Sequence, residues 1–263
     1  MSRTFFEWVV RIIDRYWFWF LQGAGVTLFI AVIGTLAGFA IGLMIGVVKT
    51  IPLDNVHKKF SIKRFFLRIF RAFLSVYIEV FRGTPMIVQA VVIYYGLSEA
   101  AGVNLHPLFA GIVIVSINTG AYMAEVVRGG IESIDKGQTE AAQAMGMTHF
   151  QTMRCVILPQ AIRNILPATG NEFVINIKDT SVLNVISVTE LFFQTKSVTG
   201  ILLRTYETFL VTAVIYLVLT VSVTKLLKYL EKKMDGPKNF TLYTSSTYPG
   251  SILKANETVK SSD

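Results

Sequence analysis

The stretch from Gly23 to Val48 contains no charged side chain over 26 consecutive residues. An uncharged apolar run of 18 or more residues is long enough to cross the hydrocarbon core of a bilayer as a helix. Of the 263 residues, 52% are hydrophobic and only 16% are charged, against about 25% charged in a typical soluble domain. The chain is therefore predicted to be an all-α integral membrane protein.

Five segments are long and apolar enough to be predicted as transmembrane helices. They are Gly23–Val48, Ala72–Leu97, Leu108–Val127, Ile165–Val188 and Tyr206–Leu227. The fourth differs from the others because it contains many polar groups.

Basic residues predict the orientation, because cytoplasmic loops are enriched in Lys and Arg. The first loop contains Lys49, Lys58, Lys59, Lys63, Arg64, Arg68 and Arg71, whereas the loop at 98–107 has no basic residue. The fifth span is followed by Lys228, Lys232, Lys233 and Lys238. The N-terminus is predicted outside and the C-terminus in the cytoplasm of a multi-pass membrane protein. The basic loops are thus topology signals, and no nucleic-acid partner is expected.

Three regions follow from this pattern. Residues 1–20 mix aromatic and charged side chains and are predicted to be a helix in the membrane interface; an aromatic belt that anchors the first span is a compatible alternative. Residues 21–235 form the predicted transmembrane domain in contact with lipid. Residues 236–263 are polar and predicted to be poorly ordered. The single Cys excludes an internal disulfide, and the three scattered His give no metal-ligand spacing.

Glycine recurs at every fourth position of the first span, at Gly34, Gly38, Gly42 and Gly46. This spacing leaves a flat groove along one helix face, so that another helix can approach closely. The pattern predicts helix packing and carries no information about chemistry.

The segment 129–164 falls between the third and fourth spans, on the predicted cytoplasmic side. Residues Asp135–Met147 are predicted to be helical, with Asp135 as N-cap and several alanines as strong helix formers. Pro159 and Pro167 are predicted to interrupt the helix and turn the chain back into the bilayer. A connector that lies on the membrane surface is the alternative.

This segment resembles the EAA motif of ABC importer permeases. The matching residues are Glu140, Ala141 and Ala142, then Gly146, and then Leu158 and Pro159. Two further stretches, Val76–Leu97 and Asn171–Leu183, are similar to the branch of that family that imports polar amino acids. The resemblance covers nearly the whole chain except the basic first loop and the C-terminal tail, and it implies a multi-pass protein of the bacterial cytoplasmic membrane.

The resemblance implies a role for the segment and a set of partners. In such permeases the segment is a coupling helix that docks on a cytosolic ATPase dimer, so the six motif residues above are the expected ATPase-coupling residues. The chain has no G-x-x-x-x-G-K-[ST] loop, so it is predicted not to be an enzyme and to hold no cofactor, with ATP and Mg on the partner. A second permease copy or homologue and an extracellular or periplasmic substrate-binding protein or domain are the other expected partners.

Ionisable and polar groups at bilayer depth are functional candidates because they are costly there. Glu79 and Arg82 are predicted to pair on one helix face, and Glu125 and Arg128 repeat the spacing; structural pairs are favoured over ligand contact. Pro85 should kink the second span, which makes Glu79, Arg82, Gly83 and Pro85 a predicted structural or hinge set.

The predicted substrate pathway centres on the polar fourth span. Asp179 is expected to bind the ammonium or guanidinium group of a substrate, and Thr180 and Ser181 its carboxylate; Lys178 and Asp179 could instead serve a subunit interface. Weaker candidates are Gln89, Asn118 and Tyr122, since a single polar residue in a span more often makes an interhelical hydrogen bond.

The predicted function is that of the permease subunit of an ATP-driven importer that translocates a polar amino acid by alternating access. An ion-gradient-driven secondary transporter is the alternative, and a non-transporting scaffold a weaker one. Glutamine, glutamate, arginine, histidine and cystine all remain open as substrates.

Overall fold

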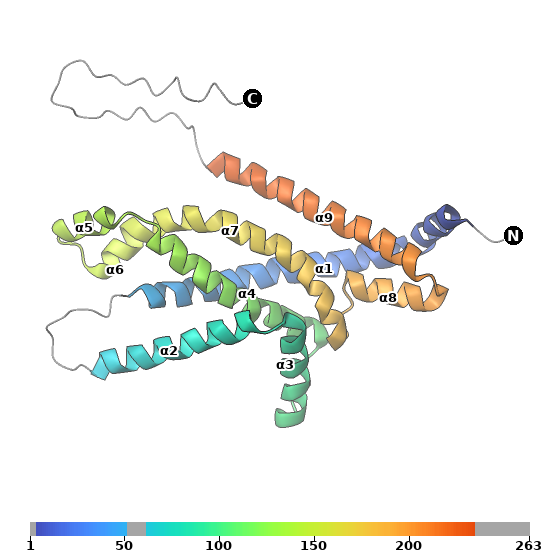
Figure 1. The fold of residues 1–263 in the computed structure, drawn as a ribbon, viewed down its shortest axis with the longest axis horizontal. Helices are drawn as coiled ribbons and strands as arrows, with labels where there is room; N and C mark the ends of the chain where they lie inside the picture. The colour runs from blue at the N-terminus through green and yellow to red at the C-terminus, as the bar shows by residue number, and fades with distance from the viewer. Residues whose placement is uncertain (1–3, 52–61, 235–263) are drawn as a thin grey trace, which may run out of the picture.

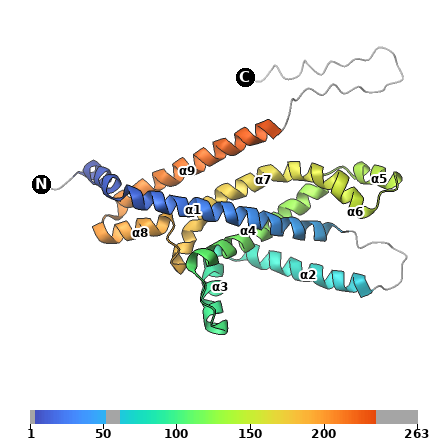
Figure 2. The ribbon, with the colours of Figure 1, turned by 180° about the vertical axis from the view of Figure 1, so that it is seen from behind.

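The computed structural model describes residues 4–51 and 62–234, and within these ranges every regular element is helical (Figure 1). The elements are α1 (Phe5–Thr50), α2 (Ile62–Gly83), α3 (Met86–Ala101), α4 (Pro107–Glu132), α5 (Lys136–Ala144), α6 (His149–Thr152), the π-helical turn η1 (Met153–Ile157), α7 (Leu158–Asp179), the 3-10 helix η2 (Thr180–Ile186), α8 (Leu191–Leu202) and α9 (Thr205–Met234). The short helices α5 and α6 lie at one end of the bundle and α8 at the opposite end (Figures 1 and 2). The predicted all-α class is confirmed.

Helix α1 runs the length of the bundle as one element (Figure 2). Its 46 residues span about 69 Å at 1.5 Å per residue. It begins at a capping box between Thr4 and Glu7, and it joins the predicted interfacial segment to the first span without a break. Its early turns pack through Ile12, Tyr16 and Phe20 onto α8 and α9. The position of residues 1–20 in a membrane interface stays a prediction.

The glycine stripe of α1 lies against α4. The facing pairs advance together along both helices, and they are Gly34 with Val115, Gly38 with Thr119, Gly42 with Met123 and Gly46 with Val127. A Cβ built on any of these glycines would come within 2.6 Å of an atom of its partner, closer than real Cβ contacts allow. The two helices are therefore parallel and packed at backbone distance, which confirms the predicted groove and identifies its partner within the same chain.

The predicted second span is two helices instead of one. Helices α2 and α3 meet at an angle of 114° across Thr84 and Pro85, and α3 projects sideways from the bundle (Figure 1). Pro85 has no N–H to continue the hydrogen-bond ladder and favours an extended residue before it. The predicted kink is confirmed, and it is sharp enough that the pair is a broken span or a re-entrant segment.

Three described helices are long and apolar enough to cross a membrane, α1, α4 and α9, and the bent α2–α3 pair makes a possible fourth. Helix α7 does not meet that test among the described residues, so five spans and their orientation stay predictions.

The prediction that Pro167 interrupts the helix is wrong, because α7 continues through this residue. A proline in a packed membrane helix is tolerated where neighbouring groups compensate for the lost hydrogen bond. Pro159 lies in the first turn of α7, where its missing N–H costs least.

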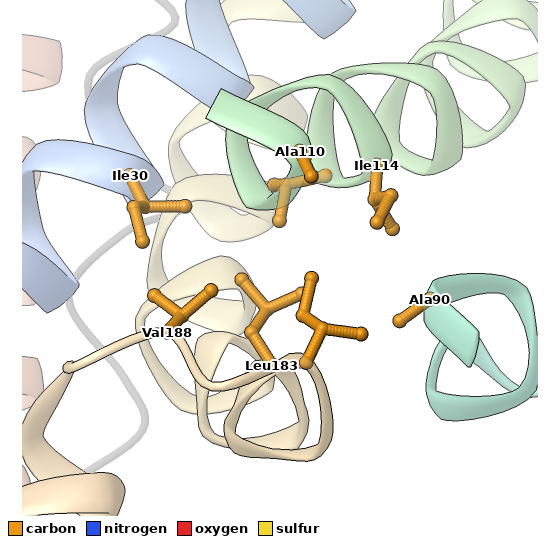
Figure 3. Close-up of a cluster of buried hydrophobic side chains, with 8 residues drawn as sticks. Ile30, Ala90, Ala110, Ile114, Leu183 and Val188 are labelled. Atoms are coloured by element: carbon orange, nitrogen blue, oxygen red, sulfur yellow. The ribbon is translucent and has the colours of Figure 1, made fainter. Parts of the chain in front are cut away.

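A buried apolar cluster closes the bundle near the α2–α3 bend. It brings together Ile30, Ala90, Ala110, Ile114, Val115, Leu183, Ile186 and Val188 from α1, α3, α4 and the η2 segment (Figure 3). Helix α8, which the hydropathy pattern did not predict, begins just beyond this cluster. Its N-cap Glu190 accepts hydrogen bonds from the backbone N–H groups of Phe192 and Phe193 and from the hydroxyl of Tyr216.

Two predictions fall on residues that the structure does not describe. They are the middle of the basic first loop, at 52–61, and the polar tail after residue 234.

The α1–α4 interface predicts different effects for two glycines of the same helix. Gly42→Ala places a methyl group against the backbone of Met123 and Ala124, so we expect a loss of about 1–3 kcal/mol in the free energy of unfolding from overpacking. Gly25→Ala is the matched control, because nothing lies within 4 Å of a Cβ there. Thermal unfolding of both purified variants in detergent measures the difference, and equal melting temperatures would refute the close packing.

Candidate functional site

Helix α5 forms the tip of one end of the bundle. The side chain of Asp135 accepts a hydrogen bond from the N–H of Gly137 at 2.6 Å, which confirms the predicted N-cap. Ala142 is 1% exposed and packs inward, whereas Glu140 and Ala141 face outward. The motif thus divides into one alanine that fixes α5 to the rest of the chain and two residues that remain available for contact.

The end of α5 requires a glycine. Gly146 has φ +80°, a left-handed conformation that costs little only for glycine. The N–H of Gly146 donates to the carbonyl of Gln143 and the N–H of Met147 to that of Ala142, at 2.9 and 3.1 Å. This pair of bonds is the Schellman motif, which satisfies the last carbonyls of a helix and reverses the chain.

A second turn follows and leads into α7. Thr148 and Gln151 form a capping box for α6, and the π-turn η1 joins α6 to the start of α7 at Leu158. Two large apolar side chains of this segment are exposed, Met145 at 73% and Phe150 at 70%. Exposed apolar groups beside Glu140 and Ala141 give the tip the character of a docking surface. Within the predicted 129–164 segment, we call residues 135–158 the coupling segment, after the role that the EAA resemblance implies.

Gln89 and Asn118 were predicted as weak pathway candidates, and the structure buries both, at 6% and 7% exposure. Pro85 has no N–H to offer the carbonyl of Phe81, and the Gln89 side-chain amide donates to that oxygen at 2.9 Å. It also donates to the carbonyl of Thr84, while Asn118 donates to the Gln89 side-chain oxygen at 2.9 Å. In this structure the two amides stabilise the α2–α3 bend, in agreement with the interhelical hydrogen bond that was the alternative for Asn118.

Arg82 has a different partner from the one predicted. Its guanidinium lies 5.5 Å from the ring centroid of Tyr122 on α4, and no ion pair joins it to Glu79 among the described residues. A cation over an aromatic face is stabilised by the ring quadrupole, so Arg82 links α2 to α4. Tyr122 keeps 37% of its surface exposed. Gly83, the other residue of the predicted hinge set, lies in open space, because nothing lies within 4 Å of a Cβ built there.

The predicted pair of Glu125 and Arg128 is present and extends further. Arg128 lies 2.8 Å from Glu125 and 2.6 Å from Glu132, and Lys49 at the end of α1 lies 3.0 Å from Glu125. The pair therefore belongs to a network that ties the end of α1 to α4.

The residues of the polar fourth span separate into two groups. Asp179 is exposed at the end of α7, next to the change from α-helix to the 3-10 helix η2, and Ser181 is partly exposed. Thr180 is fully buried and donates to the carbonyl of Ile177 at 3.0 Å, so its hydroxyl does not face a pathway here. Glu172, two helical turns before Asp179 on the same face, was not selected from sequence and is only partly buried.

Asn176 is a structural residue that sequence reasoning did not single out. It is 2% exposed, and its amide donates to Thr35 of α1 at 2.8 Å and to Thr119 of α4 at 3.0 Å. The contact joins three helices that are far apart in sequence, and only its position in the polar fourth span marked it.

The described residues contain no group of three or more His, Cys, Asp or Glu side chains arranged for a metal ion.

Comparison with known proteins assigns this arrangement to a family. The family model described as "Binding-protein-dependent transport system inner membrane component" matches residues 60–236. This match includes α2 to α9, with the bend, the coupling segment and the polar α7. The chain belongs to this family.

Curated relatives cover most of the permease. It is 39% identical over 220 residues to the glutamine transport system permease protein GlnP of Escherichia coli K12, which covers 81% of this chain and 92% of that relative. It is 35% identical over 219 residues to the probable amino-acid permease protein YxeN of Bacillus subtilis, over 82% and 92% of the two chains.

Solved structures share the fold. A crystal structure of an amino acid ABC transporter with histidines is 36% identical, has a TM-score of 0.74, and covers 89% of the permease and 100% of that chain. An inward-facing structure of the MetNI methionine ABC transporter has a TM-score of 0.68 over 83% of the permease at 21% identity, which supports the fold alone.

Proposed function

We propose that the permease is the transmembrane subunit of an ATP-driven ABC importer and that its substrate is a polar amino acid. The observation that carries this proposal is the coupling segment. It forms a tip that is packed through buried Ala142 and closed by Gly146 in a left-handed turn, with Glu140, Met145 and Phe150 exposed. Relatives named as amino-acid permeases supply the substrate class.

The proposed orientation places the coupling segment in the cytoplasm. The end of α1, the start of α2 and the end of α9 carry the basic residues, and the positive-inside rule assigns that end to the cytoplasm. Helix α8, at the end of the bundle opposite to α5 and α6, then lies at the outer side. The polar α7 is the proposed fifth membrane crossing, sheltered from lipid by neighbouring helices or a second subunit.

The proposed partners each supply something that this chain lacks. A dimer of ATPase subunits would bind ATP and Mg and receive the coupling segment, because the chain has no phosphate-binding loop of its own. A second permease copy or homologue would complete the pathway beside the exposed face of Asp179. A substrate-binding protein or domain outside would deliver the amino acid.

The proposed mechanism is alternating access driven by ATPase closure. Movement of the docked segment is transmitted to α4 and α7, which the coupling segment joins directly in sequence, and the bent α2–α3 pair provides a second moving part. Changing a two-state population from 1:99 to 99:1 takes about 5.5 kcal/mol, which ATP binding at two sites can supply. In the substrate pathway, Asp179 would bind a positive group of the amino acid, and Ser181 at the start of the 3-10 helix η2 would receive its carboxylate.

Reconstitution tests this function directly. Vesicles that contain the permease, its ATPase subunits and its binding protein should accumulate a labelled amino acid only with ATP, and the transported amino acid should stimulate ATP hydrolysis. Accumulation by the permease alone, driven by an ion gradient, would instead establish the secondary transporter.

We expect substitutions in the coupling segment to uncouple ATP hydrolysis from uptake while the complex still assembles. Glu140→Lys reverses an exposed charge, and Gly146→Trp adds a large side chain to a left-handed turn. In reconstituted vesicles we expect uptake to fall at least tenfold while ATP hydrolysis no longer responds to substrate. Full transport by both variants would exclude docking through this segment.

A substitution of Asp179 is expected to weaken substrate uptake without affecting assembly of the complex. Asp179→Asn removes a charge from an exposed position on α7, so uptake should weaken by about tenfold while the complex still assembles. Size-exclusion chromatography with the ATPase subunits checks assembly, and Asn171→Asp, which adds a charge at another exposed position of α7, is the control. Collapse of the complex would make Asp179 a structural residue.

A further inference from the structure

A cavity of about 580 Å³ separates the coupling segment from the end of α1 and from Arg71 in the middle of α2. One wall carries Lys49 and Arg71, and the other carries Thr139, Gln143 and His149. Neither the sequence motifs nor the proposed docking surface uses this cavity, which lies behind the exposed tip of α5.

Among the described residues, the positive charge of the first wall is not fully neutralised. The Arg71 guanidinium donates to the carbonyls of Lys49 and Ile51, the last acceptors of α1, and carbonyls leave its charge uncompensated. Lys49 pairs with Glu125 at 3.0 Å, and the lining carboxylate Glu132 pairs with Arg128 at 2.6 Å. The three cations Lys49, Arg71 and Arg128 are therefore balanced by only two carboxylates, those of Glu125 and Glu132.

The opposite wall offers hydrogen-bonding side chains without partners in the described part of the chain. The side chains of Thr139, Gln143 and His149 make no hydrogen bond within residues 4–51 and 62–234. The hydroxyl of Thr152 in the same wall is buried and also has none. Gln143 and His149 are exposed, whereas Thr152 is 1% exposed. Because buried polar groups in proteins nearly always have a partner, the Thr152 hydroxyl has unused capacity for a polar ligand, and the exposed side chains beside it can turn toward the same ligand.

The remaining surface of the cavity is apolar. Ile131 and Ile134 at the end of α4 and Met153 and Ile157 of η1 contribute to it. Cations on one side, hydrogen-bonding groups on the other and an apolar floor suit a molecule with an anionic head and an apolar part. Basic pockets between membrane helices on the cytoplasmic side are the sites at which anionic lipid headgroups bind.

We propose that this cavity binds a phosphate group, held between Lys49 and Arg71 on one side and Gln143, Thr139 and His149 on the other. Its source is the headgroup of an anionic phospholipid or a soluble phosphate ester, which share this chemistry. A bound phosphate bridges the coupling segment to α1 and α2 and so stiffens the connection between the docking tip and the membrane helices. The inference uses the orientation proposed above and does not depend on what is transported.

Native mass spectrometry of the full-length chain with phosphatidylglycerol and phosphatidylcholine tests the site. Wild-type protein should bind phosphatidylglycerol at least fivefold more tightly than phosphatidylcholine. Gln143→Glu places a like charge in the wall and should weaken phosphatidylglycerol binding about fivefold. Gln138→Glu is the matched control, since Gln138 lies on the same helix outside the cavity lining. Thr139→Val removes a donor without adding charge and should show a smaller loss.

A second arm identifies the source of the phosphate. Inorganic phosphate and glycerol 3-phosphate at millimolar concentration are titrated into lipid-depleted protein, with thermal unfolding as the measurement. Stabilisation that Gln143→Glu removes assigns the site to a soluble phosphate, and its absence beside selective phosphatidylglycerol binding assigns it to lipid. The proposal is overturned if neither probe distinguishes wild type from Gln143→Glu, or if Gln138→Glu weakens binding equally. Because no transport is measured, neither result bears on the proposed importer function.

Discussion

The packing of α1 against α4 is the contact on which the rest of this fold depends. Within a bilayer, helices gain little from excluding apolar surface, so close van der Waals contact is a main source of association. Four glycines spaced by one turn let α1 approach the backbone of α4, and Lys49 pairs with Glu125 where this interface ends. With α4 held in this way, Asn118 lies against the α2–α3 bend, and Thr119, which faces α1, hydrogen-bonds Asn176 of α7.

Side-chain amides and carboxylates compensate for broken helices in this structure. The Gln89 amide donates a hydrogen bond to the Phe81 carbonyl that Pro85 leaves unpaired. The Glu190 carboxylate accepts hydrogen bonds from the first N–H groups of α8. An unpaired backbone group in a lipid environment is costly, so each bend requires such a residue nearby. The same bends and the 3-10 turn after Asp179 place irregular backbone beside the proposed pathway, where polar main-chain atoms are useful to a polar substrate.

The coupling segment combines a rigid base with an exposed face. Ala142 and the Schellman turn at Gly146 fix its shape, while Met145 and Phe150 remain uncovered. It continues through η1 directly into α7, so a displacement of the tip reaches the polar helix without an intervening flexible link. The cavity behind α5 makes this connection less densely packed than the α1–α4 interface, which gives a bound ligand room to alter its stiffness.

The sequence by itself determined those features that depend only on residues close together in the chain. Charge-free length predicted the membrane helices, glycine spacing predicted a close interface, Pro85 predicted the kink, and Asp135 and Gly146 marked the ends of α5. Local patterns did not reveal helix α8 or the continuation of α7 through Pro167. Only the tertiary structure decided that Arg82 faces Tyr122 instead of Glu79, that Gln89 and Asn118 are buried, and that Asn176 joins α1, α4 and α7. The reason is physical: a polar side chain in a membrane helix must find a partner, and which partner is within reach depends on how distant segments pack.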